Sequence, residues 1–128
     1  MKHINVEIKD RNWKVSVWLS ITTYYSDKII KEFKEMKAGE QLLTDAEDVL
    51  KKANLNTGLC YSNTKERKSL IVTAKGSSKA EILDSIIHEC MHVVQHVSEA
   101  DNIDMQGEIP CYMIGDLVRD VYNSADIF

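Results

Sequence analysis

The residues with the clearest potential for chemistry are His88, Glu89 and His92, which form an HExxH pentapeptide in a stretch with helical periodicity. On an α-helix, residues i and i+4 lie on the same face, so the two histidines can bind one zinc ion. Glu89 would stand beside the metal as a general base. The pattern predicts a centre for metal-assisted hydrolysis.

A catalytic zinc site needs one more protein ligand and keeps one position for water. Glu108 is the preferred candidate, because it begins the last predicted helix, which can turn back across the motif helix. His96 is the competitor, but it lies about 12 Å of helix rise from His88, so a straight helix does not easily bring all three imidazoles to one ion. We predict that His96 packs beside the ligands or hydrogen-bonds to them. Further alternatives are Asp101 and Asp104.

The expected reaction follows from charge. Zinc lowers the pKa of its bound water towards about 7, and Glu89 can take the proton and later deliver it to a leaving amine. The tetrahedral intermediate needs a hydrogen-bond donor opposite the metal, and Tyr112 and Tyr61 are the candidates. These residues together predict hydrolysis of a peptide or amide bond. In the structural alternative, His88 and His92 are buried histidines satisfied by hydrogen bonds, and Glu89 is a solvated helix residue.

The three cysteines, Cys60, Cys90 and Cys111, do not have the spacing of a zinc ribbon or finger. An odd number of cysteines also argues against a disulfide framework. We predict reduced and mostly buried thiols, with Cys90 as a packing residue that points away from the face of the two motif histidines.

Composition limits the class of protein. A chain of 128 residues with 44% hydrophobic content predicts one globular domain, residues 1–128, with a core that needs no disulfide or metal to hold it. No run approaches the roughly 20 apolar residues of a membrane span, and charge interrupts the N-terminus where a signal peptide would be apolar. A net charge of −4 without a basic stripe argues against nucleic acid as a partner. We expect a cytoplasmic protein whose oligomeric state is open.

Hydrophobic periodicity predicts mixed secondary structure. Alternation over 4–8 and 15–19 indicates an N-terminal hairpin, and helical spacing follows from Ser26 or Asp27 to a stop near Gly39. A second, short helix is predicted to begin at Thr44, whose position relative to Glu47 resembles a capping box. The class is therefore α+β.

The second half of the chain repeats this order. The segments 58–62 and 69–74 flank a polar turn and predict a second hairpin. A cap at 76–78 then predicts that the motif helix begins two to three turns before His88. A last helix is expected from 107–110 onwards, with a frayed tail after Asn123.

The stretch from about residue 58 to 121 resembles the minimal zincin-like metallopeptidase domains, particularly small ones encoded by phages and prophages. The matching text is HECMHVVQH at 88–96 followed by GEIPCYMIG at 107–115. The resemblance differs at Pro110 and Cys111, where zinc proteases that cleave phage repressors carry an alanine-rich helix.

The resemblance implies a small zincin-like α+β domain, with β-hairpins packed on the active-site helix and a C-terminal helix after it. It implies Zn²⁺ as cofactor, with His88, His92 and Glu108 as ligands and Glu89 as catalytic base. The location would be the host cytoplasm if the chain is phage-encoded.

Two functions remain open at this point. The first is a small zinc endopeptidase or amidase, acting on a peptide or protein laid as an extra strand against the edge at 69–74. The second is a catalytically inactive zincin-shaped module that binds zinc or a protein partner. Replacement of Glu89 by glutamine should separate the two, because only the enzyme depends on that carboxylate.

Overall fold

The computed structural model describes residues 2–21, 26–51, 58–74 and 76–126. These residues form an α+β fold, as predicted, with four α-helices, a short 3-10 helix η1 (Lys9–Arg11) and one sheet. The strands are β1 (Lys2–Ile8), β2 (Trp13–Ile21), β3 (Gly58–Asn63) and β4 (Lys68–Ala74). The α-helices are α1 (Ser26–Glu35), α2 (Glu40–Lys51), α3 (Lys79–Ala100) and α4 (Glu108–Ala125).

Two predicted hairpins join to make a mixed sheet. β1 pairs with β2 and β3 pairs with β4, both antiparallel, while β2 and β4 pair in parallel. The strand order is β1-β2-β4-β3, so β4 is an interior strand and β3 is an edge strand. The segment 69–74 therefore cannot offer a free edge to a peptide, and the strand that can do so on this side of the sheet is β3.

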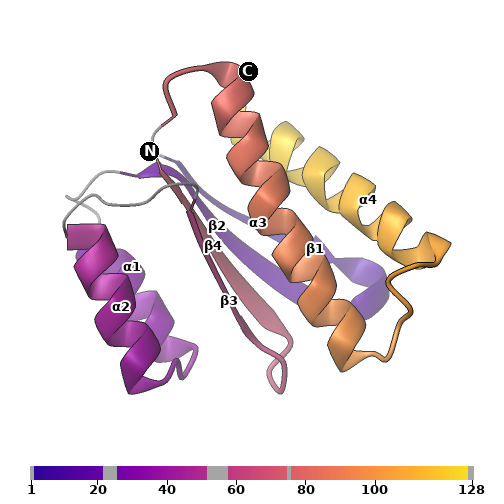
Figure 1. The fold of residues 1–128 in the computed structure, drawn as a ribbon, viewed down its shortest axis with the longest axis horizontal. Helices are drawn as coiled ribbons and strands as arrows, with labels where there is room; N and C mark the ends of the chain where they lie inside the picture. The colour runs from indigo at the N-terminus through magenta and orange to yellow at the C-terminus, as the bar shows by residue number, and fades with distance from the viewer. Residues whose placement is uncertain (1, 22–25, 52–57, 75, 127–128) are drawn as a thin grey trace.

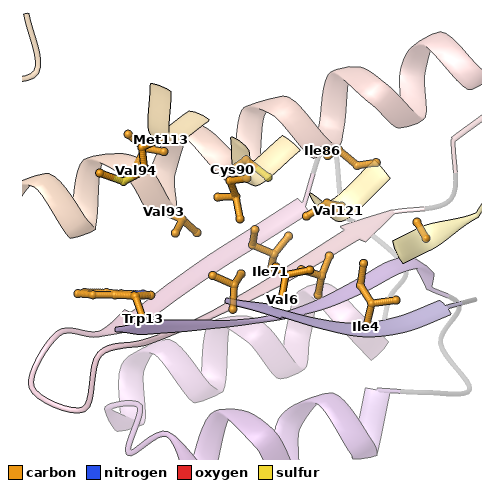
Figure 2. Packing of buried hydrophobic residues seen from close by; sticks show 14 of the residues in the cluster. Ile4, Val6, Trp13, Ile71, Ile86, Cys90, Val93, Val94, Met113 and Val121 are labelled. Carbon is orange, nitrogen blue, oxygen red and sulfur yellow. The ribbon is translucent and has the colours of Figure 1, made fainter. Parts of the chain in front are cut away.

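The helices form a layer on each face of the sheet (Figure 1). α3 and α4 lie side by side on one face, with α3 against β3 and β4 and α4 against β1. The apolar core beneath them joins side chains from both helices and three strands, including Val6, Ile71, Val93 and Val121 (Figure 2). α1 and α2 cover the other face over a second core, which includes Trp18, Phe33, Leu50 and Leu70.

The N-terminus of α3 is set by the predicted cap. Ser78 has extended backbone, and its hydroxyl accepts a hydrogen bond from the backbone N–H of Glu81 at 3.1 Å. Such a cap satisfies one of the N–H groups that the first turn leaves unpaired. Because α3 then continues to Ala100, His88 and His92 lie in the middle of a long helix, where the backbone fixes their relative positions.

Two predicted boundaries are wrong. α2 begins at Glu40, and Thr44 lies inside it, donating its hydroxyl hydrogen bond to the carbonyl of Glu40 at 2.9 Å. α4 continues past Asn123 to Ala125, because Ala125 is buried in the core. Pro110 does not kink α4, since it is the third residue of the helix and no N–H is needed there.

Arg67 connects three parts of the fold. Its guanidinium donates to the backbone oxygen of Arg11 and forms a two-bond contact with Asp101, with both N–O distances at 2.8 Å. The same group lies over the ring of Trp13 at 5.0 Å. Arg67 thus ties both hairpins to the C-terminal end of α3.

Of the helices in the described ranges, none is long and apolar enough to cross a membrane.

Candidate metal centre

His88 and His92 have the separation that two ligands of one zinc ion require. Their ring centroids are 5.0 Å apart and the rings are nearly perpendicular, at 75°. A Zn–N bond of about 2.1 Å places each centroid about 3.2 Å from the metal, so a tetrahedral angle gives a separation of about 5 Å. His88 is exposed and His92 is half-buried, which leaves the pair open to an ion from solvent.

Glu89 is buried, with 2% of its surface exposed. Among the described residues, Glu89 is the one aspartate or glutamate that is buried. Its Oε1 lies 3.9 Å from Nε2 of His88. The prediction that Glu89 stands beside the histidines is consistent with this distance. The alternative, in which Glu89 is a solvated helix residue, is wrong.

Gly58 allows Glu89 its position against β3. A Cβ atom at Gly58 would lie 2.2 Å from the carbonyl oxygen of Val72 and 3.2 Å from Cγ of Glu89. Real Cβ atoms do not approach a backbone oxygen that closely, so a larger residue would force Gly58 away from Val72 on β4. The second contact is tight but with a side chain, so the absence of a Cβ at Gly58 also leaves space for Glu89 of the motif helix.

His96 is not placed as a third tetrahedral ligand. Its ring centroid is 6.4 Å from that of His92, a separation that would require an almost linear arrangement about a shared zinc ion. Its Nδ1 is hydrogen-bonded to Oγ of Ser62 on β3 at 2.6 Å. Burial lowers the pKa of His96, and the neighbouring His92 lowers it further. His96 is therefore hydrogen-bonded to β3, and its predicted place beside the zinc ligands stays a prediction.

Glu108 lies near the C-terminal end of the motif helix, away from the histidine pair in the middle of that helix. It is the first residue of α4, which runs antiparallel to α3 after the connection 101–107, so it lies level with the Ala100 end. His88 and His92 are 8 to 12 residues earlier, about 12 to 18 Å along the helix. α4 also packs towards β1, whereas Glu89 faces β3. The structure does not bring Glu108 to the pair.

The other acidic candidates have different contacts. Asp101 is held by Arg67 and Arg11, and the hydrogen bond from Arg67 is the main reason that its pKa is lowered. Asp104 accepts from the backbone N–H of Gln106 at 3.0 Å and shapes the turn before α4. Within the described ranges, no three side chains of the metal-binding types lie close enough to hold an ion together.

Neither tyrosine proposed as a donor lies at the histidine pair. Tyr61 faces the α1 and α2 side of the sheet, where its hydroxyl donates to the carbonyl of Met36 at 3.2 Å. Tyr112 is 67% exposed and lines a groove of about 630 Å³ between α4 and the end of β1. Since β1 and β3 are opposite edges of the sheet, this groove lies away from the side of α3 that carries Glu89.

The thiols differ from one another in their surroundings. Cys90 is buried in the core as predicted, and burial, with a smaller effect of Glu89, raises its pKa to about 12. Burial likewise raises the pKa of the Cys60 thiol, which is half-buried on β3. Cys111 is exposed, so the prediction that it is buried is wrong. All three are free thiols, and the raised pKa of Cys60 and of Cys90 makes these two poor metal ligands, because the thiolate is the form that binds metal.

Sequence reasoning missed a chain of hydrogen bonds that leads to His96. The indole N–H of Trp13 donates to Oγ of Ser69 at 2.8 Å, and Oγ of Ser69 lies 2.6 Å from Oγ of Ser62. Ser62 and Ser69 are cross-strand neighbours in the second hairpin. The serines were visible in the sequence as polar residues in predicted strands, but their link to Trp13 depends on the parallel pairing of β2 with β4.

The chain was compared with known proteins at the level of sequence and of structure. No protein-family model matches it, and neither the curated proteins nor the solved structures contain a match. The geometry of the side chains on α3 and β3 therefore carries the functional argument by itself.

Proposed function

We propose that the protein is a zinc-dependent hydrolase of peptide or amide bonds, with His88 and His92 as zinc ligands and Glu89 as general base. The observation that carries the proposal is the buried carboxylate of Glu89 beside two imidazoles at chelating separation. Bound zinc would activate water and stabilise negative charge on the substrate.

The burial of Glu89 supports this proposal because it is costly. Moving a carboxylate out of water is unfavourable unless positive charge or hydrogen bonds compensate it. A cation held by His88 and His92 would lie within a few ångströms of this carboxylate, since Oε1 of Glu89 is 3.9 Å from Nε2 of His88. A glutamate at this position would then stabilise the bound cation as well as act as a base.

The proposed substrate position is the open edge of β3. β3 pairs with β4 on one side, and among the described strands it has no neighbour on the other. This strand runs beside the motif helix, as the contacts of Gly58 with Glu89 and of Ser62 with His96 indicate. An extended peptide could add to β3 through main-chain hydrogen bonds and pass close to the histidines. The small zincin-like domain that we propose would thus bind its substrate along this edge of the sheet.

Glu108 stays our candidate for the third protein ligand, and its variant is part of the test. It is exposed, and it forms no ion pair with any residue in the described ranges. Binding through Glu108 requires the connection 101–107 and the first turn of α4 to move towards the histidines. Loss of zinc from a Glu108→Ala variant would support that movement.

The test combines metal content with hydrolysis. We would measure zinc by elemental mass spectrometry and cleavage of fluorescein-labelled casein for the native protein, His88→Ala, Glu108→Ala and Glu89→Gln. The matched control is His3→Ala, which removes a histidine from β1. We expect one zinc per chain in the native protein, the control and Glu89→Gln, and none in His88→Ala. Hydrolysis should survive only in the native protein and the control. A native protein that takes up no zinc would overturn the proposal.

A second function is favoured by one observation, namely that no third ligand joins the pair among the described residues. A two-histidine site without a further ligand fits a catalytically inactive module that binds zinc or a protein partner. Such a module would tolerate Glu89→Gln without loss of binding. Zinc uptake without hydrolysis of any peptide would favour this function.

A further inference from the structure

β1 is the second edge strand of the sheet, on the opposite side from β3. It pairs with β2 over its whole length of seven residues in an unbroken register, and among the described strands it has no neighbour on its other side. Edge strands are usually protected from further pairing by proline, lysine, a bulge or a short length. β1 has no proline and no bulge, and its one lysine is the first residue, Lys2. Its outer edge is therefore suited to pair with another strand.

The sequence of β1 is complementary to itself. Two copies that pair antiparallel about a two-fold axis at Asn5 overlap over all seven residues. This register places His3 opposite Glu7 at both ends of the pair and Ile4 opposite Val6 next to its centre, with opposite side chains on the same face. His3 and Glu7 are both exposed, and Glu7 forms no ion pair with any other residue in the described ranges. The longest overlap thus brings an imidazole to a carboxylate twice.

The same axis brings the α4 helices of two copies together. A two-fold axis between antiparallel strands of one sheet is perpendicular to the sheet, so both copies carry α3 and α4 on one common face. α4 is the helix that packs on β1, and it lies outside α3 (Figure 1). Its exposed apolar side chains Ile109 and Tyr112 line the groove beside the end of β1, which no residue of α3 lines. An apolar surface therefore lies where the second copy would approach.

Strand pairing and this groove would contribute together to an interface. A stable dimer buries roughly 800 Å² per partner, with an apolar centre and a polar rim. Ile109 and Tyr112 are 49% and 67% exposed and supply apolar area beside the strand. Arg119, which also lines the groove, contacts Asp116 and Asp120 of its own chain at 3.3 Å. A second copy can therefore cover the apolar side chains without having to neutralise these charges.

We propose that the protein forms a homodimer through β1, in which two four-stranded sheets join into one sheet of eight strands and the two α4 helices lie beside each other over the joint. This proposal does not depend on zinc. Because β1 and β3 are opposite edges of the sheet, the dimer leaves the β3 edge and the histidine pair open.

The first measurement is the dissociation constant of the dimer, from sedimentation velocity over a range of protein concentrations. We expect the native protein to show a monomer–dimer equilibrium. Tyr112→Ala should raise the dissociation constant roughly 10-fold, because aromatic side chains covered at an interface contribute strongly to binding. The matched control is Tyr122→Ala, which removes an exposed tyrosine of α4 that does not line the groove. Its dissociation constant should stay within about threefold of the native value.

The second measurement tests the charge pairs. His3→Glu places two carboxylates opposite each other at both ends, and Glu7→Lys places two basic groups there, so each variant alone should dimerise roughly 3- to 10-fold more weakly. In an equimolar mixture, the new glutamate faces the new lysine, and Glu7 of one variant faces His3 of the other. Mixing should therefore restore dimers. Because His3 also lies 3.9 Å from Glu32 of its own chain, circular dichroism must show that each variant is folded.

The third measurement tests the register by cross-linking, in a Cys111→Ser background that lacks the exposed thiol. Asn5→Cys places two thiols directly opposite each other, with Cα atoms about 4.5–5.5 Å apart, which suits a disulfide. Glu7→Cys is the control, because the two introduced thiols would be four residues out of register, about 14 Å apart. We expect mild oxidation to join two chains of Asn5→Cys and not of Glu7→Cys.

The outcomes decide the proposal independently of the zinc site. A native protein that sediments as a monomer at every concentration would overturn it. A dimer of unchanged affinity in Tyr112→Ala and in both charge variants would mean that another surface is used, and the proposal would then be wrong. Equal cross-linking of Asn5→Cys and Glu7→Cys would also contradict it. If a charge variant does not fold, Tyr112→Ala and the cross-linking pair still decide. Zinc content should be the same in Tyr112→Ala as in the native protein.

Discussion

The two faces of the sheet differ in what they bury, and β3 shows the difference within one strand. The side chains that face α3 are small, and they contact chemical groups of the motif helix: Gly58, Cys60 and Ser62. Those that face the opposite core and α1 are larger: Leu59, Tyr61 and Asn63. Small residues let α3 approach the strand closely, so one face of β3 serves the candidate site and the other serves packing.

The same contrast extends over the whole sheet. Beneath α3 the structure buries a carboxylate and hydroxyl groups, among them Glu89 and Ser69, and connects Ser69 to a histidine. The buried cluster beneath α1 and α2 is apolar, and the polar residues buried on that side, Ser16 and Ser26, carry hydroxyls and no charge. Burial of polar groups costs free energy unless each has a partner. The buried carboxylate thus lies on the face that carries the motif, and buried charged groups are typical of a site with a function.

The largest expected effect is a loss of stability without a loss of zinc binding, on the face of the sheet that α1 and α2 cover. Phe33→Ala, in the core under α1, should lower the free energy of unfolding by about 3–5 kcal/mol, because it leaves a cavity. The folded variant should bind zinc as the native protein does. Denaturant unfolding and metal content measure the two quantities. Val93→Ala, in the core beneath α3, is the matched variant on the other face of the sheet. If Phe33→Ala lost zinc affinity and Val93→Ala did not, the proposed division of roles between the two faces would be wrong.

A smaller change tests the lack of space at Gly58, which lies against the carbonyl of Val72 on β4 and Cγ of Glu89 on α3. Gly58→Ala should destabilise the fold by about 1–3 kcal/mol, because the added Cβ has no space beside the carbonyl of Val72. Gly115→Ala on α4 is the matched control. A Cβ there meets no atom within 4 Å, so alanine should stabilise the helix by roughly 0.5–1 kcal/mol. Thermal unfolding measures the stability of Gly58→Ala and of Gly115→Ala. If both substitutions changed stability equally, β3 would be able to move enough to accept the added Cβ.

The buried hydroxyls offer a third comparison between the faces. Ser69→Ala should cost about 1–3 kcal/mol, because the indole N–H of Trp13 is left buried without an acceptor. Ser16→Ala removes a hydroxyl that binds His3 at 2.8 Å on the other side of the sheet, at a position where water can reach. Its cost should be below about 1 kcal/mol. Chemical denaturation measures the loss of unfolding free energy in both variants. If Ser16→Ala cost more than Ser69→Ala, the hydrogen bonds from Trp13 to His96 would not stabilise the fold as expected.

The smallest expected effect depends on pH. The hydrogen bond from Arg67 holds the pKa of Asp101 below its ordinary value. A lowered folded-state pKa contributes stability that is present above the unfolded pKa of about 3.9 and lost as pH falls through the folded pKa. Asp101→Asn should therefore be less stable than the native protein at neutral pH, and the difference should shrink in acid. A difference that is constant down to pH 2 would assign the effect to packing.

Much of the fold could be predicted from local sequence. Both hairpins, the first helix, the cap at Ser78 and the helix that carries the motif follow from periodicity and turn residues. The position of Tyr61 was also within reach of such reasoning, because neighbours on a strand face opposite ways and Ser62 faces α3. The edge strand was assigned wrongly because strand order depends on the parallel pair β2 and β4, which no local pattern encodes.

The candidate site was predictable only where its residues share a helix. His88, Glu89 and His92 have relative positions that helix geometry dictates, so their proximity required no tertiary information. The placement of Glu108 depends on how α4 packs against α3 and β1, and the sequence contains no signal for it. The contact of Glu89 with Gly58 and the bonds of His96 also depend on tertiary packing.

The parallel pairing of β2 with β4 has a consequence for how the molecule folds. Val15 pairs with Ser69, and the bond from Trp13 to Ser69 spans 56 positions of the chain, so these contacts form only after the segment that contains α1 and α2 has been closed into a loop. Closing long loops before contacts reward them slows folding. Each hairpin can form early from local contacts, whereas the hydrogen bonds that reach His96 must await the joining of the two halves. The site should therefore form in the slowest phase of refolding. Fluorescence of a Trp18→Phe variant, in which Trp13 is the remaining tryptophan, would follow this phase in the presence of zinc.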